Sequence, residues 1–569
     1  MNDFASKIIK YRSITITVFI GVTVFFLMQL PHLKVEFDLG KMLLLNDDAR
    51  QFRQDMRKVF NAREMFFIGI SGKNIMTPEA LRMIQELTDK VGKIEGVQRA
   101  VSITNIRNIT GEEGSLDVAP IMEDIPETES EIEQFKRNLT ENPLVFKNLI
   151  SKDMKMASVN IHMSYGEHNK MLDFVLKGIR NLQKEINVPA GLSMHLAGVH
   201  VQKIEAQTMI LKDLKHLIPL IIIWLAFVNY LNVSWVAKRF NKFSLSMFIT
   251  AVVLPVTGII AATIWTFGLM ALLGKPLSVL SSLIAILIMA VGSAYFIYFL
   301  NHYHKMTLIL NDSKAAVEFA YQGSWKPLFL ANITTCAGFF SMVFTPLRGI
   351  KEFGYFASFA MLVVAFSVLI VLPAVLSFFK TPEMLSEIDE TKLFREERFI
   401  QLIKRMGHML VRKRWAVVCV LIFLLIFTAV GMASLNLNNN VMHYLKKDNF
   451  VRQDFEVFNK NLPGVAHLSL IINAGEKDAI LKPDNLKKVE DLEKYIEQLP
   501  EVEKTISLIK YIKLINRAMN GGDIKSQVLP ESEEMTAQYL LFFSFSDGNE
   551  IMEQMISYDS AILRIILKN

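Results

Sequence analysis

The chain has 569 residues, 51% of them hydrophobic and 21% charged, and its mean hydropathy is +0.30. A soluble globular protein is rarely so apolar, and a bare helical bundle in lipid rarely keeps 62 basic and 56 acidic side chains. We therefore expect membrane spans combined with water-facing domains, and exclude a disordered chain or a disulfide-stapled scaffold. The net charge of +6 is small for this length and gives no sign of a nucleic-acid partner. Both cysteines, Cys336 and Cys419, lie in apolar runs, which disfavours a disulfide or a zinc site.

Seven segments are apolar enough to cross a bilayer, which takes about 20 residues. They are predicted at 13–31, 217–232, 243–273, 276–300, 327–345, 353–379 and 415–434. None carries Asp, Glu, Lys, Arg or His in its apolar body. The first resembles a signal peptide, but no small-residue cleavage site follows Pro31, so we interpret it as a retained anchor.

The basic residues gather on one side of these spans. The flanks on the side of the N-terminus, which include Lys7, Lys10 and Arg12, sum to a charge of +9. The short loops on the other side sum to +2, which leaves −5 for the two large domains. Because cytoplasmic flanks collect Lys and Arg, we predict a cytoplasmic N-terminus and two large domains outside.

The predicted spans divide the chain into six parts. They are a cytoplasmic N-terminus with the first span (1–31), a first outer domain (32–216), a five-span cluster (217–380), a cytoplasmic amphipathic linker helix (381–414), a seventh span (415–434) and a second outer domain (435–569). The linker interleaves apolar and basic residues, which suits either a helix lying on the membrane or a solvated connection.

The two outer domains resemble each other, which indicates an internal duplication. Five short motifs recur in order at a spacing of about 398 to 406 residues. They begin at Arg53 and Arg452, Val59 and Val457, Pro78 and Pro483, Ile125 and Leu529, and Ile150 and Ile556. Asn569 aligns with Met163, after which the first copy continues through the rest of its outer domain and five spans. We therefore expect the chain to be truncated in its second repeat, as a fragment or by nature.

Each outer domain is predicted to be α/β. In the first, Thr77 is a plausible N-cap and Pro78 suits the first helical turn, while Leu81, Ile84 and Val91 mark one apolar face. Strands are predicted at 65–70, 97–103, 157–163 and 192–196, and helices at 77–91 and 171–186. The second domain repeats this start with strands at 467–473, 502–508 and 562–568 and a helix at 483–499. The order predicts split ferredoxin-like β-α-β units.

No motif for catalysis stands out in the sequence. A Ser-His-Asp set, a Walker loop, a dinucleotide fingerprint and metal-ligand spacing of Cys or His are all missing from the pattern. His302 and His304 are two residues apart, so they do not share a helix face as i,i+4 ligands would. We predict that the protein is not an enzyme and holds no cofactor or metal.

The arrangement of one span, an outer domain and five clustered spans, followed by the start of a second copy, resembles the resistance–nodulation–division (RND) superfamily. Within it the chain is most similar to the MMPL, or predicted exporter, branch, whose five-span cluster resembles a sterol-sensing domain. The stretch Gly292-Ser293-Ala294-Tyr295 resembles the signature of the fourth span. Residues 334–339, Gly354 and Leu372-Pro373 resemble the patterns of the fifth and sixth spans.

The candidate site is therefore the fourth-span motif Gly292, Ser293, Ala294 and Tyr295. In proton-driven members of the superfamily an Asp of the proton relay usually stands where this chain has Ala294. Gly292 and Tyr295 would line a relay or transport path, or serve helix packing and an interior hydrogen bond. A relay in this protein would need a titratable group elsewhere, or the protein is not driven by protons.

The resemblance implies a multi-pass transporter of the bacterial inner membrane that exports a hydrophobic or lipid-like substrate. Its expected partners are the bilayer and that substrate, with a homo-oligomer or periplasmic accessory proteins as further partners and no nucleic acid. Two alternatives remain open: a lipid-sensing or accessory membrane protein that does not transport, and an accessory factor of protein export.

Overall fold

The computed structural model divides into two compact units, each described here by itself. One comprises Met1–Leu45 and Gln207–Asn440, and the other Asn46–Ala206 and Val441–Asn569. The structure describes residues 2–35, 48–61, 64–111, 116–163, 169–240, 248–310, 312–379, 398–435, 445–462 and 467–568. The predicted loop around Lys242 and the first half of the predicted linker, 380–397, lie outside the described residues.

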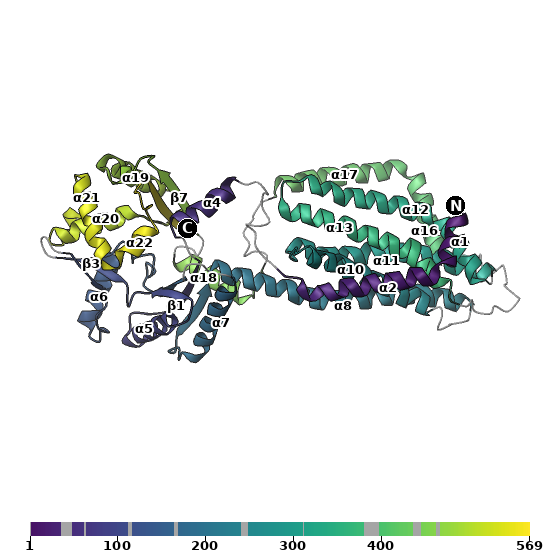
Figure 1. Cartoon of the computed structure of the whole chain (residues 1–569), viewed down its shortest axis with the longest axis horizontal. Coiled ribbons are helices and arrows are strands. Elements are labelled where there is room, and N and C mark those ends of the chain that lie inside the picture. The colour runs from purple at the N-terminus through teal and green to yellow at the C-terminus, as the bar shows by residue number, and fades with distance from the viewer. Residues whose placement is uncertain are drawn as a thin grey trace. The chain divides into compact units, whose positions relative to one another are not determined.

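The first unit is a bundle of long apolar helices (Figure 1). In chain order they are α1 (Asn2–Lys10), α2 (Arg12–Gln29), α8 (Val199–Phe240, which begins in the other unit), α10 (Leu254–Leu272), α11 (Val279–Leu310), α12 (Ser313–Ser341), α13 (Arg348–Phe366), α14 (Leu372–Leu376), α16 (Arg398–Arg412) and α17 (Arg414–Ala433). Seven candidate spans are found among the described residues, which confirms a polytopic helical membrane protein. The fifth begins at Ser313 rather than 327, because Asp312 caps its first turn and Pro327 is accommodated inside the helix.

Two spans contain a π-helical turn directly before a proline. Residues Ile249–Val253 form such a turn before Pro255, and Ser367–Val371 form one before Pro373. Proline has no N–H to donate and its ring clashes with the carbonyl of residue i−4, so the ladder of hydrogen bonds widens locally. These two prolines thus act on the backbone of the third and sixth spans.

Small residues let the spans approach one another closely. A Cβ atom on Gly258 of α10 would lie 2.3 Å from Cζ of Phe296 on α11, and one on Gly354 of α13 would lie 2.8 Å from the carbonyl oxygen of Phe339. Asn332 of α12 donates a hydrogen bond of 2.8 Å to the carbonyl oxygen of Met361 on α13. The fifth-span and sixth-span motifs therefore serve the packing of α12 against α13.

The second unit contains most of the two domains that the sequence repeat predicted, here called the first and the second copy. The first copy has a four-stranded antiparallel sheet in the order β2-β5-β1-β6, from β1 (Met65–Gly72), β2 (Val97–Val101), β5 (Met156–Met163) and β6 (Leu192–Ala197). Helices α5 (Pro78–Gly92) and α7 (Asn169–Glu185) complete two split β-α-β units, which confirms the predicted fold class. As predicted, the Thr77 side chain accepts a hydrogen bond from the backbone N–H of Ala80.

Between β2 and β5 the first copy inserts a hairpin and a helix. The hairpin is formed by β3 (Arg107–Thr110) and β4 (Asp117–Pro120), and the helix is α6 (Glu129–Glu141). The predicted strand 97–103 ends at Val101, because the backbone N–H of Ser102 bonds to the Asn105 side chain and the chain turns toward the hairpin.

The second copy repeats the first part of this fold. Its sheet has the order β7-β9-β8, from β7 (His467–Asn473), β8 (Lys504–Ile506) and β9 (Ile562–Lys568). Its helices are α18 (Phe450–Asn461), α19 (Pro483–Ile496), α20 (Leu508–Met519), α21 (Glu533–Phe543) and α22 (Asn549–Glu553). The predicted strand 502–508 is shorter, because Ser507 caps α20 and ends the strand.

The repeated motif before β5 and β9 folds into the same turn in both copies. Ser151 accepts a hydrogen bond from the Met156 N–H and donates one to Asp153, and Ser557 does the same with Ile562 and Asp559. In both turns the third residue after the serine has a positive φ, 54° at Met154 and 52° at Ser560. The duplication is therefore visible in hydrogen bonds as well as in sequence.

The close approach of α10 and α11 can be tested with two glycines in apolar spans. Gly258→Ala should destabilise the protein by about 1–3 kcal/mol, because the new methyl group clashes with a buried phenylalanine. Gly338→Ala on α12 should be neutral or slightly stabilising, because a Cβ there meets no atom within 4 Å and alanine favours helix. Thermal unfolding of both variants in detergent measures this, and equal shifts would contradict the packing role.

Candidate functional site

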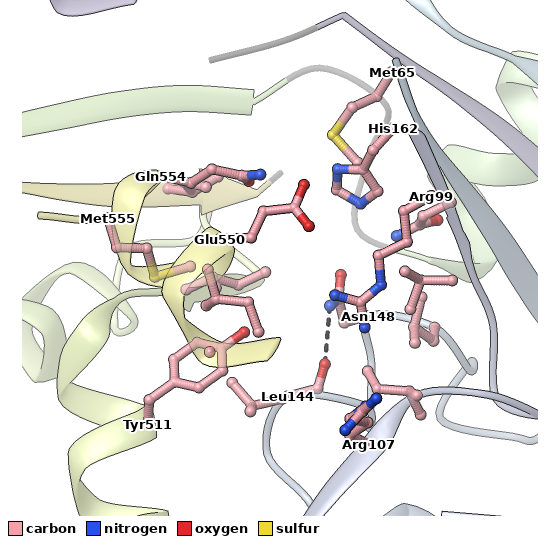
Figure 2. Close-up of a pocket in the computed structure, with 18 of the residues that line it drawn as sticks. Met65, Arg99, Arg107, Leu144, Asn148, His162, Tyr511, Glu550, Gln554 and Met555 are labelled. Atoms are coloured by element: carbon pink, nitrogen blue, oxygen red, sulfur yellow. Dashed lines mark hydrogen bonds between the residues drawn. The ribbon is translucent and has the colours of Figure 1, made fainter. Parts of the chain in front are cut away.

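A cavity of about 190 Å³ lies within the second unit, lined by residues of both copies (Figure 2). From the first copy, one face of the sheet contributes Met65 and Phe67 of β1, Arg99 and Val101 of β2, and Asn160 and His162 of β5. From the second, the sheet contributes Ile506 of β8 and Arg564, Ile566 and Lys568 of β9. These residues alternate along each strand, as side chains on one face of a sheet do.

The opposite face of each sheet is covered by helices of its own copy. Phe66, Ile68 and Ile70 of β1 are fully buried, and so are Leu563 and Ile565 of β9. Each copy thus uses one sheet face for its own core and directs the other face toward the cavity.

An apolar cluster joins the two copies beside the cavity. It combines Ile109 and Leu144 of the first copy with Ile515, Tyr539 and Phe543 of the second. Leu144 and Phe543 also line the cavity, so the apolar wall of the cavity continues into this shared core.

Charged side chains stand on the apolar walls. Arg99, Arg107, Arg564 and Lys568 line the cavity, and Glu550 is the one carboxylate among the described lining residues. Figure 2 shows Glu550 and Gln554 on one side of the cavity, with Arg99 and His162 on the other. The lining is therefore apolar with an excess of positive charge, which attracts anions more strongly in a poorly solvated cavity than in water.

The cations of the second copy are held by hydrogen bonds. Arg564 is 8% exposed and donates through Nε to the Ser469 hydroxyl at 3.0 Å. Lys568 donates to the Asn148 side chain of the first copy, and Asn148 itself donates to the Leu144 carbonyl oxygen at 2.9 Å. Burial lowers the pKa of Lys568 to about 8 and that of Arg564 to about 10.

Lys504, on the strand next to Lys568, extends this group of cations. Its Nζ donates a hydrogen bond to the carbonyl oxygen of Phe146 in the first copy. Burial, together with the positive charges of Lys510, Lys568 and Lys147, lowers the pKa of Lys504 to about 7, although Glu497 acts in the opposite direction. Among the described residues neither Lys504 nor Lys568 forms an ion pair, so the contact between the copies contains desolvated cations whose hydrogen-bond partners are neutral.

A second contact between the copies is a hydrogen-bonded chain of Ser71, His195 and Asp454. Ser71 Oγ lies 2.9 Å from His195 Nε2, and His195 Nδ1 lies 2.8 Å from Asp454 Oδ1. The other oxygen of Asp454 accepts a hydrogen bond of 2.9 Å from the Leu196 N–H. The sequence did not single out this set, because its members are 124 and 259 residues apart.

Ser71, His195 and Asp454 are hydrogen-bonded in the order of a hydrolytic triad, but the position of this set indicates a structural role. None of its three side chains lines the cavity in Figure 2. Asp454 belongs to α18 of the second copy, whereas Ser71 and His195 belong to β1 and β6 of the first. Asp454 accepts a hydrogen bond from a backbone N–H of the edge strand β6. We therefore infer that the hydrogen-bonded set of three residues holds α18 against that strand.

The residues predicted as the site, Gly292 to Tyr295, lie on α11 in the other unit. Gly292 is buried, and a Cβ there would lie 3.3 Å from Ile259 Cγ1, so it permits close helix packing. Ser293 donates to the Ala290 carbonyl oxygen at 2.9 Å, and Tyr295 packs partly buried against the apolar core. Ala294 is exposed on the surface of the unit.

Sequence reasoning missed the cavity residues, although two of them carry a usable signal. Arg99 is in phase with Val101 on one face of its strand, and Arg564 is in phase with Ile562 and Ile566. A basic residue on an otherwise apolar strand face indicates a site that faces something other than water or the core.

A family model described as the MMPL family matches residues 45–399, more than half of the chain. The chain belongs to the MMPL family. The match confirms the resemblance that the spans and motifs indicated.

Two curated proteins are similar to the chain at lower identity. The membrane protein MJ1562 of Methanocaldococcus jannaschii is 21% identical over 370 residues, which cover 63% of this chain and 87% of that protein. The hopanoid transporter HpnN of Rhodopseudomonas palustris is 27% identical over 251 residues, which cover 43% of this chain and 26% of that protein. The alignment thus covers only about a quarter of the hopanoid transporter.

The buried cations predict a stability that rises with pH. Lys504 and Lys568 have lower pKa values in the folded than in the unfolded chain, so the unfolded chain binds more protons between about pH 7 and the ordinary lysine value. Stability should increase by on the order of 2 kcal/mol from Lys504 alone between about pH 7 and pH 9. Thermal unfolding of the full chain across this range measures the slope.

Matched variants assign that slope to the buried lysines. Lys504→Met should reduce it and Lys504→Met with Lys568→Met should reduce it further, whereas Lys494→Met should leave it unchanged, because Lys494 is 60% exposed. Equal slopes for Lys504→Met and Lys494→Met would contradict the prediction.

Proposed function

We propose that this MMPL-family protein is a transporter of the bacterial inner membrane that moves a hydrophobic or lipid-like substrate outward. The observation that carries the proposal is the cavity between the two copies, whose lining is mostly apolar. It belongs to a chain with seven candidate spans, and a relative over 43% of the chain is named a hopanoid transporter. An apolar cavity in a water-facing unit suits a molecule that has to leave lipid and pass through water.

The proposed orientation places the N-terminus in the cytoplasm and both outer domains in the periplasm. Support comes from the basic residues that flank the spans on the side of the N-terminus. One of them, Arg12 at the start of α2, donates to the carbonyl oxygen of Ser377 at 2.6 Å and lies 3.9 Å from the centre of the Phe378 ring. Arg12 thereby joins the beginning of the first span to the end of the sixth.

The energy source is a separate part of the proposal. A methyl group cannot carry a proton, so Ala294 cannot serve as the carrier in α11. We propose that Gly292 and Tyr295 contribute to the packing of a moving helix, and that any proton coupling uses another titratable group. A lipid-binding protein that does not transport is the second candidate, and the lack of an acidic side chain at Ala294 favours it.

Transport of lipid by the purified full chain, reconstituted in vesicles, tests the proposal. Two cavity-filling substitutions, Ile551→Trp in the second copy and Val118→Trp in the first, should each reduce the rate of lipid transport at least tenfold, because both residues line the cavity. Leu541→Trp should not, because Leu541 is 55% exposed on α21 and is not a lining residue. A fluorescent hopanoid-like or acyl lipid serves as the probe, with and without a pH gradient.

The outcomes separate the two candidate functions. Transport that both tryptophan substitutions abolish and the control preserves supports the exporter, and its dependence on the gradient decides proton coupling. Binding of lipid to the cavity without any transport supports the lipid-binding alternative. If neither tryptophan substitution reduces transport, and all variants keep the unfolding temperature of the parent protein, the proposed role of the cavity is contradicted.

A further inference from the structure

The two copies place cations at matching positions of their sheets. In the first copy the strand register puts Arg99 of β2 opposite His162 of β5, and His162 opposite Met65 of β1. In the second copy the register puts Lys504 of β8 opposite Lys568 of β9. A row of basic side chains therefore crosses the β2-β5 pair of one copy and the equivalent β8-β9 pair of the other.

Three basic side chains line the cavity without a paired carboxylate among the described residues: Arg99 and Lys568 of this row, and Arg564 of β9. Arg99 makes no hydrogen bond or ion pair with any residue that the structure describes. Arg564 and Lys568 use neutral partners, a serine hydroxyl and an asparagine side chain. A buried or half-buried cation without a carboxylate is costly, and a bound anion would offset that cost with charge-assisted hydrogen bonds.

The remaining walls select for an apolar group beside the anion. Side chains such as Phe67, Val101, Ile109, Ile551 and Met555 line the cavity. Its volume of about 190 Å³ compares with the engineered apolar cavity of about 150 Å³ that holds benzene. The space therefore fits a head group with the first part of a tail rather than a complete lipid.

We propose that the cavity binds the head-group end of an anionic amphiphile, whose carboxylate or phosphate oxygens contact Arg99, Arg564 and Lys568. The tail lies along the apolar walls and leaves the cavity on its open side. This inference rests on the proposed function, since it names the class of substrate that the cavity would pass on. Guanidinium groups suit this task, because they bind both carboxylate and phosphate oxygens in a fork.

Binding of three amphiphiles with one tail and different head groups tests the proposal. Oleate, oleyl alcohol and oleylamine are titrated against the purified full chain in a neutral detergent, with native mass spectrometry as the readout. Oleate should bind at least tenfold more tightly than the alcohol, and the amine most weakly. Oleyl phosphate, titrated in the same way against oleate, distinguishes a phosphate head group from a carboxylate.

Variants locate the preference at the cavity. Arg99→Gln should weaken oleate binding by about tenfold, since it removes a charge-assisted hydrogen bond to the carboxylate, and should leave oleyl alcohol unaffected. Arg82→Gln is the matched control, because Arg82 is 57% exposed and pairs with Glu127 outside the cavity. Inorganic phosphate alone should compete only weakly, because it lacks the tail.

Three results would overturn the inference: equal binding of the three amphiphiles, equal effects of Arg99→Gln and Arg82→Gln, or competition by inorganic phosphate as strong as by oleate. Failure of the inference is distinct from failure of the proposed function. If Ile551→Trp blocks transport of a neutral lipid while Arg99→Gln changes no head-group preference, the proposed export is supported and the proposed anionic head group is contradicted. If Arg99→Gln weakens oleate binding but no lipid is transported, the anion-binding site is supported and the proposed transport is contradicted.

Discussion

The second unit depends on the fact that a sheet has two faces and each copy covers only one of them. The helices α5 and α7 pack against the face that carries Ile68 and Ile70, and Leu563 and Ile565 join the core of the second copy in the same way. The other faces, with Phe67 and Val101 or with Ile506 and Ile566, are too apolar to be left to water. Covering them with the other copy leaves a cavity wherever the side chains do not meet.

That arrangement explains why the contacts between the copies are so diverse. An apolar cluster, the hydrogen bonds of buried lysines and the packing of α18 each join residues far apart in sequence. Gly69 shows how close the last contact is, because a Cβ atom there would lie 2.9 Å from the ring of Phe458 on α18. Gly69 on β1 therefore leaves room for the Phe458 ring of α18. Asp454 fixes the orientation of α18 through its hydrogen bond to the edge strand β6.

The sequence predicted local structure well because local structure depends on near neighbours. Thr77 caps α5 and Leu81, Ile84 and Val91 are buried, as their spacing indicated. The order of the strands also followed from the repeated pattern, since split β-α-β units permit few alternatives.

The cavity could not be predicted in the same way. It exists because Arg99 and Lys568, which belong to different copies, face the same space, and no periodicity encodes which faces of two sheets meet. The set of Ser71, His195 and Asp454 was missed for the same reason. The predicted motif at Gly292 to Tyr295 was found through family resemblance, and the geometry around it accounts for the packing of Gly292.

The cations of the cavity also connect ligand binding to the stability of the second unit. Lys568, which would meet the anion, donates to Asn148 of the first copy, and Lys504 opposite it on β8 donates to the Phe146 carbonyl oxygen. A charge that would meet the anion therefore also helps to hold the second copy to the first. A bound anion would raise the proton affinity of these lysines and reduce their mutual repulsion. A ligand that binds only the assembled cavity stabilises that assembly by mass action. Loading with an anionic head group would therefore tighten the contact between the copies, and its departure would loosen the contact again.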